Sequence, residues 1–192
     1  KSIEVIVVDT EKNINKLKTT LQSLEAQSVK PDSIKVVSTN ETVSEKCEQD
    51  LVMRLYAGDV LNRFGLEYLC NALTTAKNSG LSFAYEKSPT YESSNFVGIK
   101  EFHPFPPQLG SVFLQEKYGR RFVGLFKKEF FNFDAPTDWQ KAINATCKGA
   151  SVEIVPRGLF ELSETEHYPE WNRMKDFNNL THSFSALPAF DA

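Results

Sequence analysis

Asp59 stands at a position where α/β proteins bind their ligands. It follows residues 51–56, LVMRLY, whose alternation predicts a strand with one well-packed face and one mixed face. Gly58 comes just before it, and a glycine lets another backbone or a phosphate come close. Open α/β sheets bind ligands at the C-terminal ends of their strands, so Asp59 is a candidate binding residue. The structural alternative is that Asp59 caps a helix that begins near Val60.

A second carboxylate lies at the start of a predicted helix. Thr137 is a candidate N-cap, Asp138 follows it in the first turn, and the helix runs through Cys147 and stops at Gly149. A carboxylate in the first turn interacts favourably with the helix dipole, by about 0.3 to 1 kcal/mol, and is kept ionised. Asp138 is therefore a stabiliser of its helix and also a group able to accept a proton.

Three elements ahead of Asp59 position it. They are a strand, a helix capped by an asparagine and a second strand, over residues 3–8, 13–27 and 33–38. A strand, helix and strand of these lengths predict a right-handed crossover and a parallel pair. Thr10 and Ser38 end or follow these two strands, so we expect them to share a cleft with Asp59.

The remaining segments complete an α/β domain. We expect a helix with an apolar stripe from Val60 to Ala76 that stops at Gly80. Further strands are predicted over residues 81–85, 122–126 and 151–155. The expected fold is a single α/β domain over residues 1–162, with a mainly parallel central sheet and helices on both faces. Residues 163–192 lack a clear period and are expected to form an irregular tail.

The composition narrows the class of protein. The chain has 192 residues, of which 41% are hydrophobic, enough for one sizeable core. A formal net charge of −3, without a basic stripe, argues against a nucleic-acid partner. Three widely spaced cysteines fit neither a disulfide framework nor a zinc site. We therefore expect a reducing, cytoplasmic compartment. The longest aliphatic run, residues 5–8, is too short to span a bilayer, so any membrane association is expected to be peripheral.

Taken in chain order, these segments resemble the GT-A fold glycosyltransferases of family 2. IEVIVVDTEKNINKLKTTLQSLEAQS is similar to that family's first strand and helix, and DSIKVVSTNET to its second strand. RLYAGDVLNRFGLEYLCNAL looks like the metal-binding segment, and FVGLFKKEFFNFDAPTDWQKAINATCKGASVEIVP like the acceptor-side segment. The match covers roughly residues 3–162. It implies one GT-A-like domain that binds a nucleotide-diphosphate sugar at the C-terminal edge of its sheet.

The resemblance also implies roles for single residues. An inverting sugar transfer needs a base for the acceptor hydroxyl and positive charge beside the leaving diphosphate. Asp138 corresponds to that base, and Asp59 to a ligand of a divalent cation, Mn²⁺ or Mg²⁺. His167 stands where some GT-A enzymes return a histidine to the metal. The residues expected to contact the nucleotide-sugar are Thr10, Ser38, Tyr56 and Trp139, although a tryptophan at a helix start is more often part of the core.

Two departures from the family lead to two hypotheses. Ser38 or Thr39 stands where the second strand usually ends in aspartate, and residues 39–50 are too short for the strand and helix expected there. The first hypothesis is an inverting glycosyltransferase with a glycan or lipid-linked acceptor. The second is a reduced, non-catalytic GT-A-like module for binding or assembly, with other domains of a longer chain as partners. Retention of both Asp59 and Asp138 favours the first, and the two departures favour the second.

Overall fold

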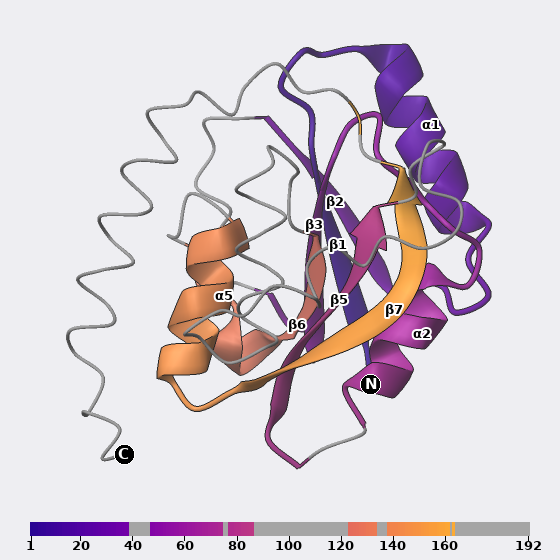
Figure 1. Ribbon diagram of the computed structural model, residues 1–192. Coiled ribbons are helices and arrows are strands. Elements are labelled where there is room, and N and C mark those ends of the chain that lie inside the picture. Colours follow the sequence, from indigo (N-terminus) through magenta and orange to yellow (C-terminus); the bar gives the residue numbers. More distant parts are fainter. Residues whose placement is uncertain (39–46, 75–76, 87–122, 134–137, 162, 164–192) are drawn as a thin grey trace.

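A seven-stranded mixed sheet occupies the centre of the part of the chain that the computed structural model describes, residues 1–38, 47–74, 77–86, 123–133, 138–161 and 163 (Figure 1). The strand order is β2-β1-β3-β6-β5-β7-β4. The strands are β1 (Ile3–Val8), β2 (Ser33–Val37), β3 (Leu51–Tyr56), β4 (Val60–Leu61), β5 (Ser79–Glu86), β6 (Gly124–Lys127) and β7 (Ser151–Glu161). The helices are α1 (Ile14–Glu25), α2 (Gly65–Ala72), α5 (Asp138–Cys147) and the short 3-10 helix η1 (Lys128–Phe130).

Most strands of the sheet run in one direction. β1 pairs in parallel with both β2 and β3, and β5 pairs in parallel with β7. β6 lies antiparallel between β3 and β5, so these two strands point the same way. β4 is antiparallel to β7. Five strands, β1, β2, β3, β5 and β7, therefore share a direction, which confirms the predicted mainly parallel α/β fold.

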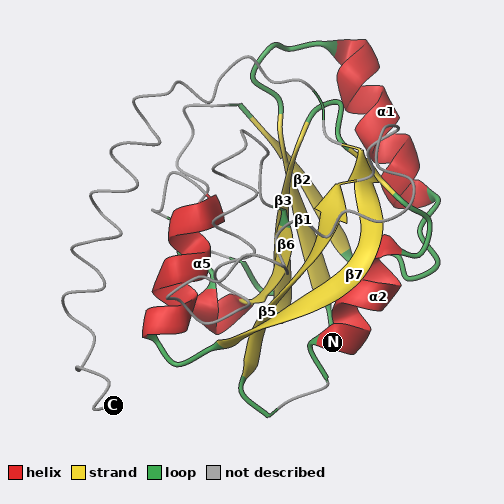
Figure 2. Ribbon diagram, in the orientation of Figure 1, coloured by secondary structure: helices red, strands yellow, loops and turns green. Residues whose placement is uncertain are grey.

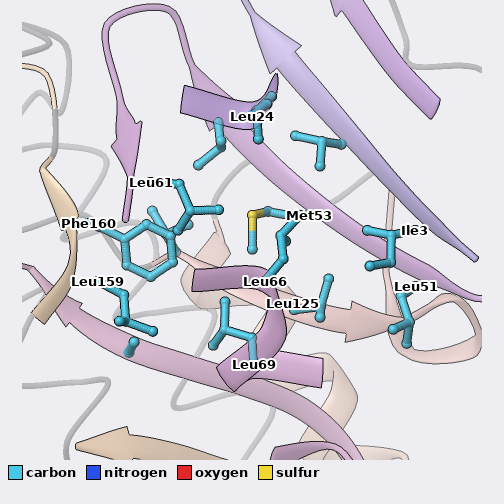
Figure 3. Packing of buried hydrophobic residues seen from close by; sticks show 14 of the residues in the cluster. Ile3, Leu24, Leu51, Met53, Leu61, Leu66, Leu69, Leu125, Leu159 and Phe160 are labelled. Carbon is cyan, nitrogen blue, oxygen red and sulfur yellow. The ribbon is translucent and has the colours of Figure 1, made fainter. Parts of the chain in front are cut away.

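Both faces of the sheet are covered, as predicted. α1 and α2 lie on one face and α5 on the other (Figure 2). Alternate residues of β1 enter two separate cores, because successive side chains of a strand point to opposite faces. All six residues of β1 are buried, as expected for a central strand. Figure 3 shows the core under α1 and α2, where Met53 lies among side chains of four other elements, Leu24, Leu66, Leu69, Leu61 and Phe160.

Local capping determines where α1 begins. The Asn13 side chain accepts hydrogen bonds from the backbone N–H groups of Asn15 and Lys16, at 3.1 and 3.2 Å, which confirms it as the N-cap. The helix ends at Glu25, two residues before the predicted end. Gln27 instead turns its buried side chain toward the β4–α2 connection. Its amide nitrogen donates to the carbonyls of Leu61 and Asn62, at 3.2 and 2.8 Å, and its oxygen accepts from the N–H of Leu66 at 3.1 Å.

The segment after β3 differs from the prediction. Residues 60 and 61 form the short strand β4 rather than the start of a helix, because they pair with the end of β7. α2 begins only at Gly65, and Phe64 before it is 45% exposed rather than part of a buried stripe. Gly80 does not stop this helix but lies inside β5. A side-chain carbon there would come within 2.4 Å of the Ala150 Cβ, so β5 needs a glycine where the α5–β7 turn approaches it.

The cysteines and the helix lengths agree with the composition. Cys47, Cys70 and Cys147 are free thiols. Burial raises the pKa of Cys70 to about 11, which makes it unreactive at neutral pH. No helix within the described ranges is long and apolar enough to cross a membrane.

A carboxylate and a serine join β3 to the N-terminal segment. Asp50, just before β3, accepts hydrogen bonds from the backbone N–H of Ser2 at 2.9 Å and from its hydroxyl at 3.3 Å. The hydroxyl of Ser2 in turn accepts from the N–H of Asp50 at 3.1 Å. Hydrogen bonding by the Ser2 backbone is the main cause that lowers the pKa of Asp50. This contact lies at the N-terminal edge of the parallel strands.

Asp50 should titrate below its ordinary pKa. Since its pKa is lower in the folded than in the unfolded state, the stabilisation it gives is present above the ordinary pKa and is lost as the pH falls through the lowered value. We expect the NMR titration midpoint of the Asp50 carboxyl carbon to lie below about 3.9, the ordinary value for aspartate. Ser2→Ala removes the hydroxyl but keeps the N–H, so it should raise the midpoint only in part. A wild-type midpoint at the ordinary value would contradict the contact.

Candidate functional site

The C-terminal ends of β1, β2 and β3 meet at one edge of the sheet. The N–H of Asp9, just after β1, donates to the Val37 carbonyl of β2 at 2.9 Å. The N–H of Ala57, just after β3, donates to the Val8 carbonyl at 2.9 Å. This edge, called the C-terminal edge below, therefore carries Thr10, Ser38, Tyr56 and Asp59. Each of them ends or follows one of these three adjacent parallel strands.

The loop between β1 and α1 is held by its own polar side chains. The carboxylate of Asp9 accepts from the N–H of Asn13 at 3.3 Å. Lys12 has a φ of 50°, the left-handed conformation that residues with side chains rarely adopt. Lys16, in the first turn of α1, forms an exposed ion pair with Glu11 at 2.8 Å. The Asp9 contact thus joins the end of β1 to the N-cap of α1 across the position of Thr10.

The turn after β3 uses all of its backbone donors within the chain. The N–H of Tyr56 donates to the Asp59 carboxylate at 2.7 Å, and the N–H of Ala57 donates to the Val8 carbonyl at 2.9 Å. The N–H of Gly58 donates to the Thr20 hydroxyl at 2.8 Å, and the N–H of Asp59 donates to the Tyr56 carbonyl at 2.9 Å. Thr20 of α1 is fully buried. None of these four amides is left for a phosphate, although the sequence suggested that Gly58 would let a phosphate come close.

Asp59 is fully buried inside this turn. One carboxylate oxygen accepts from the N–H of Tyr56 at 2.7 Å. The other accepts from the N–H and the hydroxyl of Ser163, at 2.9 and 3.0 Å. These donors compensate a negative charge that would be costly to bury alone. The alternative that Asp59 caps the following helix is wrong, because α2 begins six residues later and the Asp59 carboxylate bonds back to β3.

The described residues do not fit a divalent cation at Asp59. Both carboxylate oxygens accept hydrogen bonds from the chain, and the side chain has no exposed surface. No three histidine, cysteine, aspartate or glutamate side chains in the described ranges gather into a group that could hold a metal ion. His167, the second metal ligand predicted from the sequence, lies outside the described residues.

Two cations flank the turn after β3. The guanidinium of Arg54 lies over the Tyr56 ring, 5.7 Å from its centroid. The Lys16 side chain packs against Gly58, with its Cδ 3.5 Å from where a Gly58 Cβ would be, and its amine is paired with Glu11. The sequence offered a signal for Arg54, a charge within an otherwise apolar central strand. It offered none for Thr20 or Ser163, whose partners lie 38 and 104 residues away along the chain.

α5, the helix that carries the predicted base, lies on the face of the sheet opposite to α1 and α2. It begins at Asp138, as expected, and its buried residues include Lys141, Ala142 and Ala145. Lys141 lies under the Phe131 ring, with its amine 5.3 Å from the ring centroid. Helical spacing places position 138 one turn before Lys141 and Ala142. The side chains of Asp138 and Trp139 are not among those the structure describes.

Solved structures share this arrangement of strands and helices. TarS of S. aureus matches 95% of this chain with a TM-score of 0.60 and 13% identity, and the chain covers 68% of TarS residues 1–349. The mannosyltransferase PcManGT of Pyrobaculum calidifontis matches 95% of the chain at 12% identity, with a TM-score of 0.55 and 63% of its own length covered. Glucosyl-3-phosphoglycerate synthase of Mycobacterium tuberculosis matches 96% at 12% identity, with a TM-score of 0.56 and 78% of its own length covered.

These matches are matches of structure rather than of sequence. No protein-family model and no curated protein matches the sequence. The chain spans about two thirds of the TarS 1–349 structures and 44% of a longer TarS structure. The agreement covers nearly the whole of this chain, so it extends well beyond a shared motif. The protein has the α/β fold of the GT-A glycosyltransferases.

Proposed function

We propose that this chain is a GT-A domain that transfers a sugar from a nucleotide-diphosphate donor, with inversion at the anomeric carbon. The observation that carries the proposal is the edge where β1, β2 and β3 end, within a fold shared with glycosyltransferases. Structures of TarS contain UDP and UDP-GlcNAc, and the structure of PcManGT contains GDP-Man and Mn²⁺. The acceptor we propose is a glycan or a lipid-linked sugar.

The binding site that we propose for the nucleotide-sugar lies at the C-terminal edge. Thr10, Ser38 and Tyr56 would contact the nucleotide, and Trp139 would pack against the donor sugar. Positive charge beside the diphosphate would come from Arg54 and from Lys16, whose exposed ion pair with Glu11 would open to the ligand. The proposed mechanism includes no step through a metal, because Asp59 already bonds to Tyr56 and Ser163.

Asp138 is the proposed base. The oxygen of the acceptor hydroxyl would form a bond to the anomeric carbon, and the hydroxyl proton would pass to the Asp138 carboxylate. The bond between the anomeric carbon and the diphosphate oxygen would break, and its electron pair would leave with the diphosphate. Two features of α5 support this role. Position 138 stands at the helix N-terminus, where the dipole keeps a carboxylate ionised, and it is one turn from the buried amine of Lys141. An ionised carboxylate is the form that a base requires.

A binding module without activity is the second candidate function. The observation that favours it is the turn after β3, whose backbone donors are all used within the chain. A phosphate-binding turn would be expected to keep such donors for its ligand. In this case the chain would keep the GT-A fold as a scaffold for other parts of a longer protein.

Nucleotide diphosphates should stabilise the folded protein. A ligand that binds only the folded state adds about 2.7 kcal/mol when present at a hundred times its Kd. We expect thermal-shift measurements to show a higher Tm with millimolar UDP, GDP or their sugar conjugates, and a smaller shift with the monophosphates. The absence of any shift with all of these ligands would contradict the donor site.

Asp138→Asn should remove activity and keep the fold. It retains the shape and one oxygen but loses the basic group, so turnover should fall by about 10² to 10⁴. Donor binding and Tm should change little. The readout is hydrolysis or transfer from the donor that binds in the thermal-shift screen. Asp50→Asn, at the opposite edge of the sheet, is the matched control and should keep full turnover. Equal rates in wild type and Asp138→Asn would exclude Asp138 as the base.

A further inference from the structure

The last strand extends far enough to bring the chain back to the turn after β3. β7 is eleven residues long, and its final residues pair with β4, Glu161 with Val60 and Phe160 with Leu61. β4 follows Asp59 directly, so this pairing brings the end of β7 close to the turn that holds Asp59. Ser163 is the residue that arrives there, 104 positions away along the chain.

Ser163 and the turn after β3 are complementary in shape. Gly58 has a φ of 101°, and a Cβ on it would lie 2.8 Å from the Ser163 Cβ and 3.4 Å from its hydroxyl oxygen. Real Cβ atoms do not approach that closely, so a side chain at position 58 would displace Ser163. The space beside Gly58, which the sequence suggested for an external ligand, holds a residue of the same chain.

The hydrogen bonds are as specific as the packing. Ser163 gives both its N–H and its hydroxyl to a single oxygen of Asp59, and Tyr56 gives its N–H to the other. Charge-assisted hydrogen bonds of this kind are stronger than those between neutral groups. A divalent cation at Asp59 would have to replace these donors and would need room for further ligands, since Mg²⁺ usually keeps several waters. The fully buried carboxylate offers no such room.

We infer that Asp59 and Ser163 form a latch that fixes Ser163, two residues after β7, at the turn after β3. Asp59 is then a positioning residue rather than a metal ligand, and a nucleotide diphosphate binds this chain without a cation on Asp59. The statement about the nucleotide rests on the proposed function. The latch itself rests only on the contacts among Gly58, Asp59 and Ser163.

The latch should appear as an energetic coupling between its two residues. Asp59→Asn loses the charge and one acceptor, so we expect it to lower the folding equilibrium constant by about 5- to 30-fold in urea unfolding. Ser163→Ala removes only the hydroxyl and should have a smaller effect. In the double variant, the second change should cost less than it does in wild type. Fully additive effects would overturn the latch.

Asp50 and Ser2 provide a matched control pair. There too a carboxylate accepts from the N–H and hydroxyl of a distant serine, but on the exposed opposite edge of the sheet. Asp50→Asn and Ser2→Ala should change the folding equilibrium less than the corresponding latch variants, because exposed hydrogen bonds exchange with water at little cost. Equal losses at the two sites would mean that burial gives Asp59 no special role.

Gly58→Ala tests the packing without changing a polar group. The added methyl group must displace Ser163 and strain a backbone with positive φ. We expect faster hydrogen exchange at the Ser163 amide in this variant and in Asp59→Asn, with the Val7 amide of the central strand as the internal reference. Unchanged exchange at Ser163 in both variants would show that the contact does not hold Ser163.

Mn²⁺ and UDP then separate the latch from the proposed function. We expect the UDP affinity of wild type, Asp59→Asn and Ser163→Ala to be the same in Mn²⁺ and in EDTA, within about twofold. Affinity that depends on Mn²⁺ and is lost in Asp59→Asn but kept in Ser163→Ala would make Asp59 a metal ligand and overturn the inference, while the proposed function would stand. If no variant binds UDP but the coupling is present, the proposed function fails and the latch remains.

Discussion

The parallel pairing of β1 with both β2 and β3 is the constraint on which the rest of the structure depends. Parallel neighbours bring their C-terminal ends together, so the residues after three separate strands gather at one edge whatever their distance in sequence. The same pairing buries β1 completely and requires cover on both faces, which α1, α2 and α5 supply. β6, antiparallel to β3, then joins this half of the sheet to β5, β7 and β4.

The elements that could be predicted from the sequence are those determined by neighbouring residues. The apolar run of β1 and the cap at Asn13 act within a few positions, and both were confirmed. β4 could not be predicted, because two residues become a strand only when the end of β7 pairs with them. The prediction that Gly80 stops a helix was wrong for a similar reason, because the distant Ala150 is the residue that requires a glycine there.

The candidate site shows the same division between local and distant effects. The position of Asp59 at the end of a strand followed from the pattern of residues 51–56, but its partners did not. Tyr56 and Ser163 determine what the carboxylate can do, and Ser163 is separated from it by most of the chain. The pattern of a strand thus predicts where a carboxylate at its end will lie, but it does not predict the chemical role of that carboxylate. The role depends on which other groups form hydrogen bonds to its oxygens.

Two carboxylate–serine contacts, one at each end of β3, have a mechanical consequence. Asp50 and Asp59 stand at opposite ends of β3, one bound by Ser2 and the other by Ser163. Ser2 leads directly into β1 and Ser163 follows β7, so each contact ties one end of β3 to a different strand of the sheet. β3 is thereby held at both ends, and it cannot slide along β1 or β6 without losing one of these contacts.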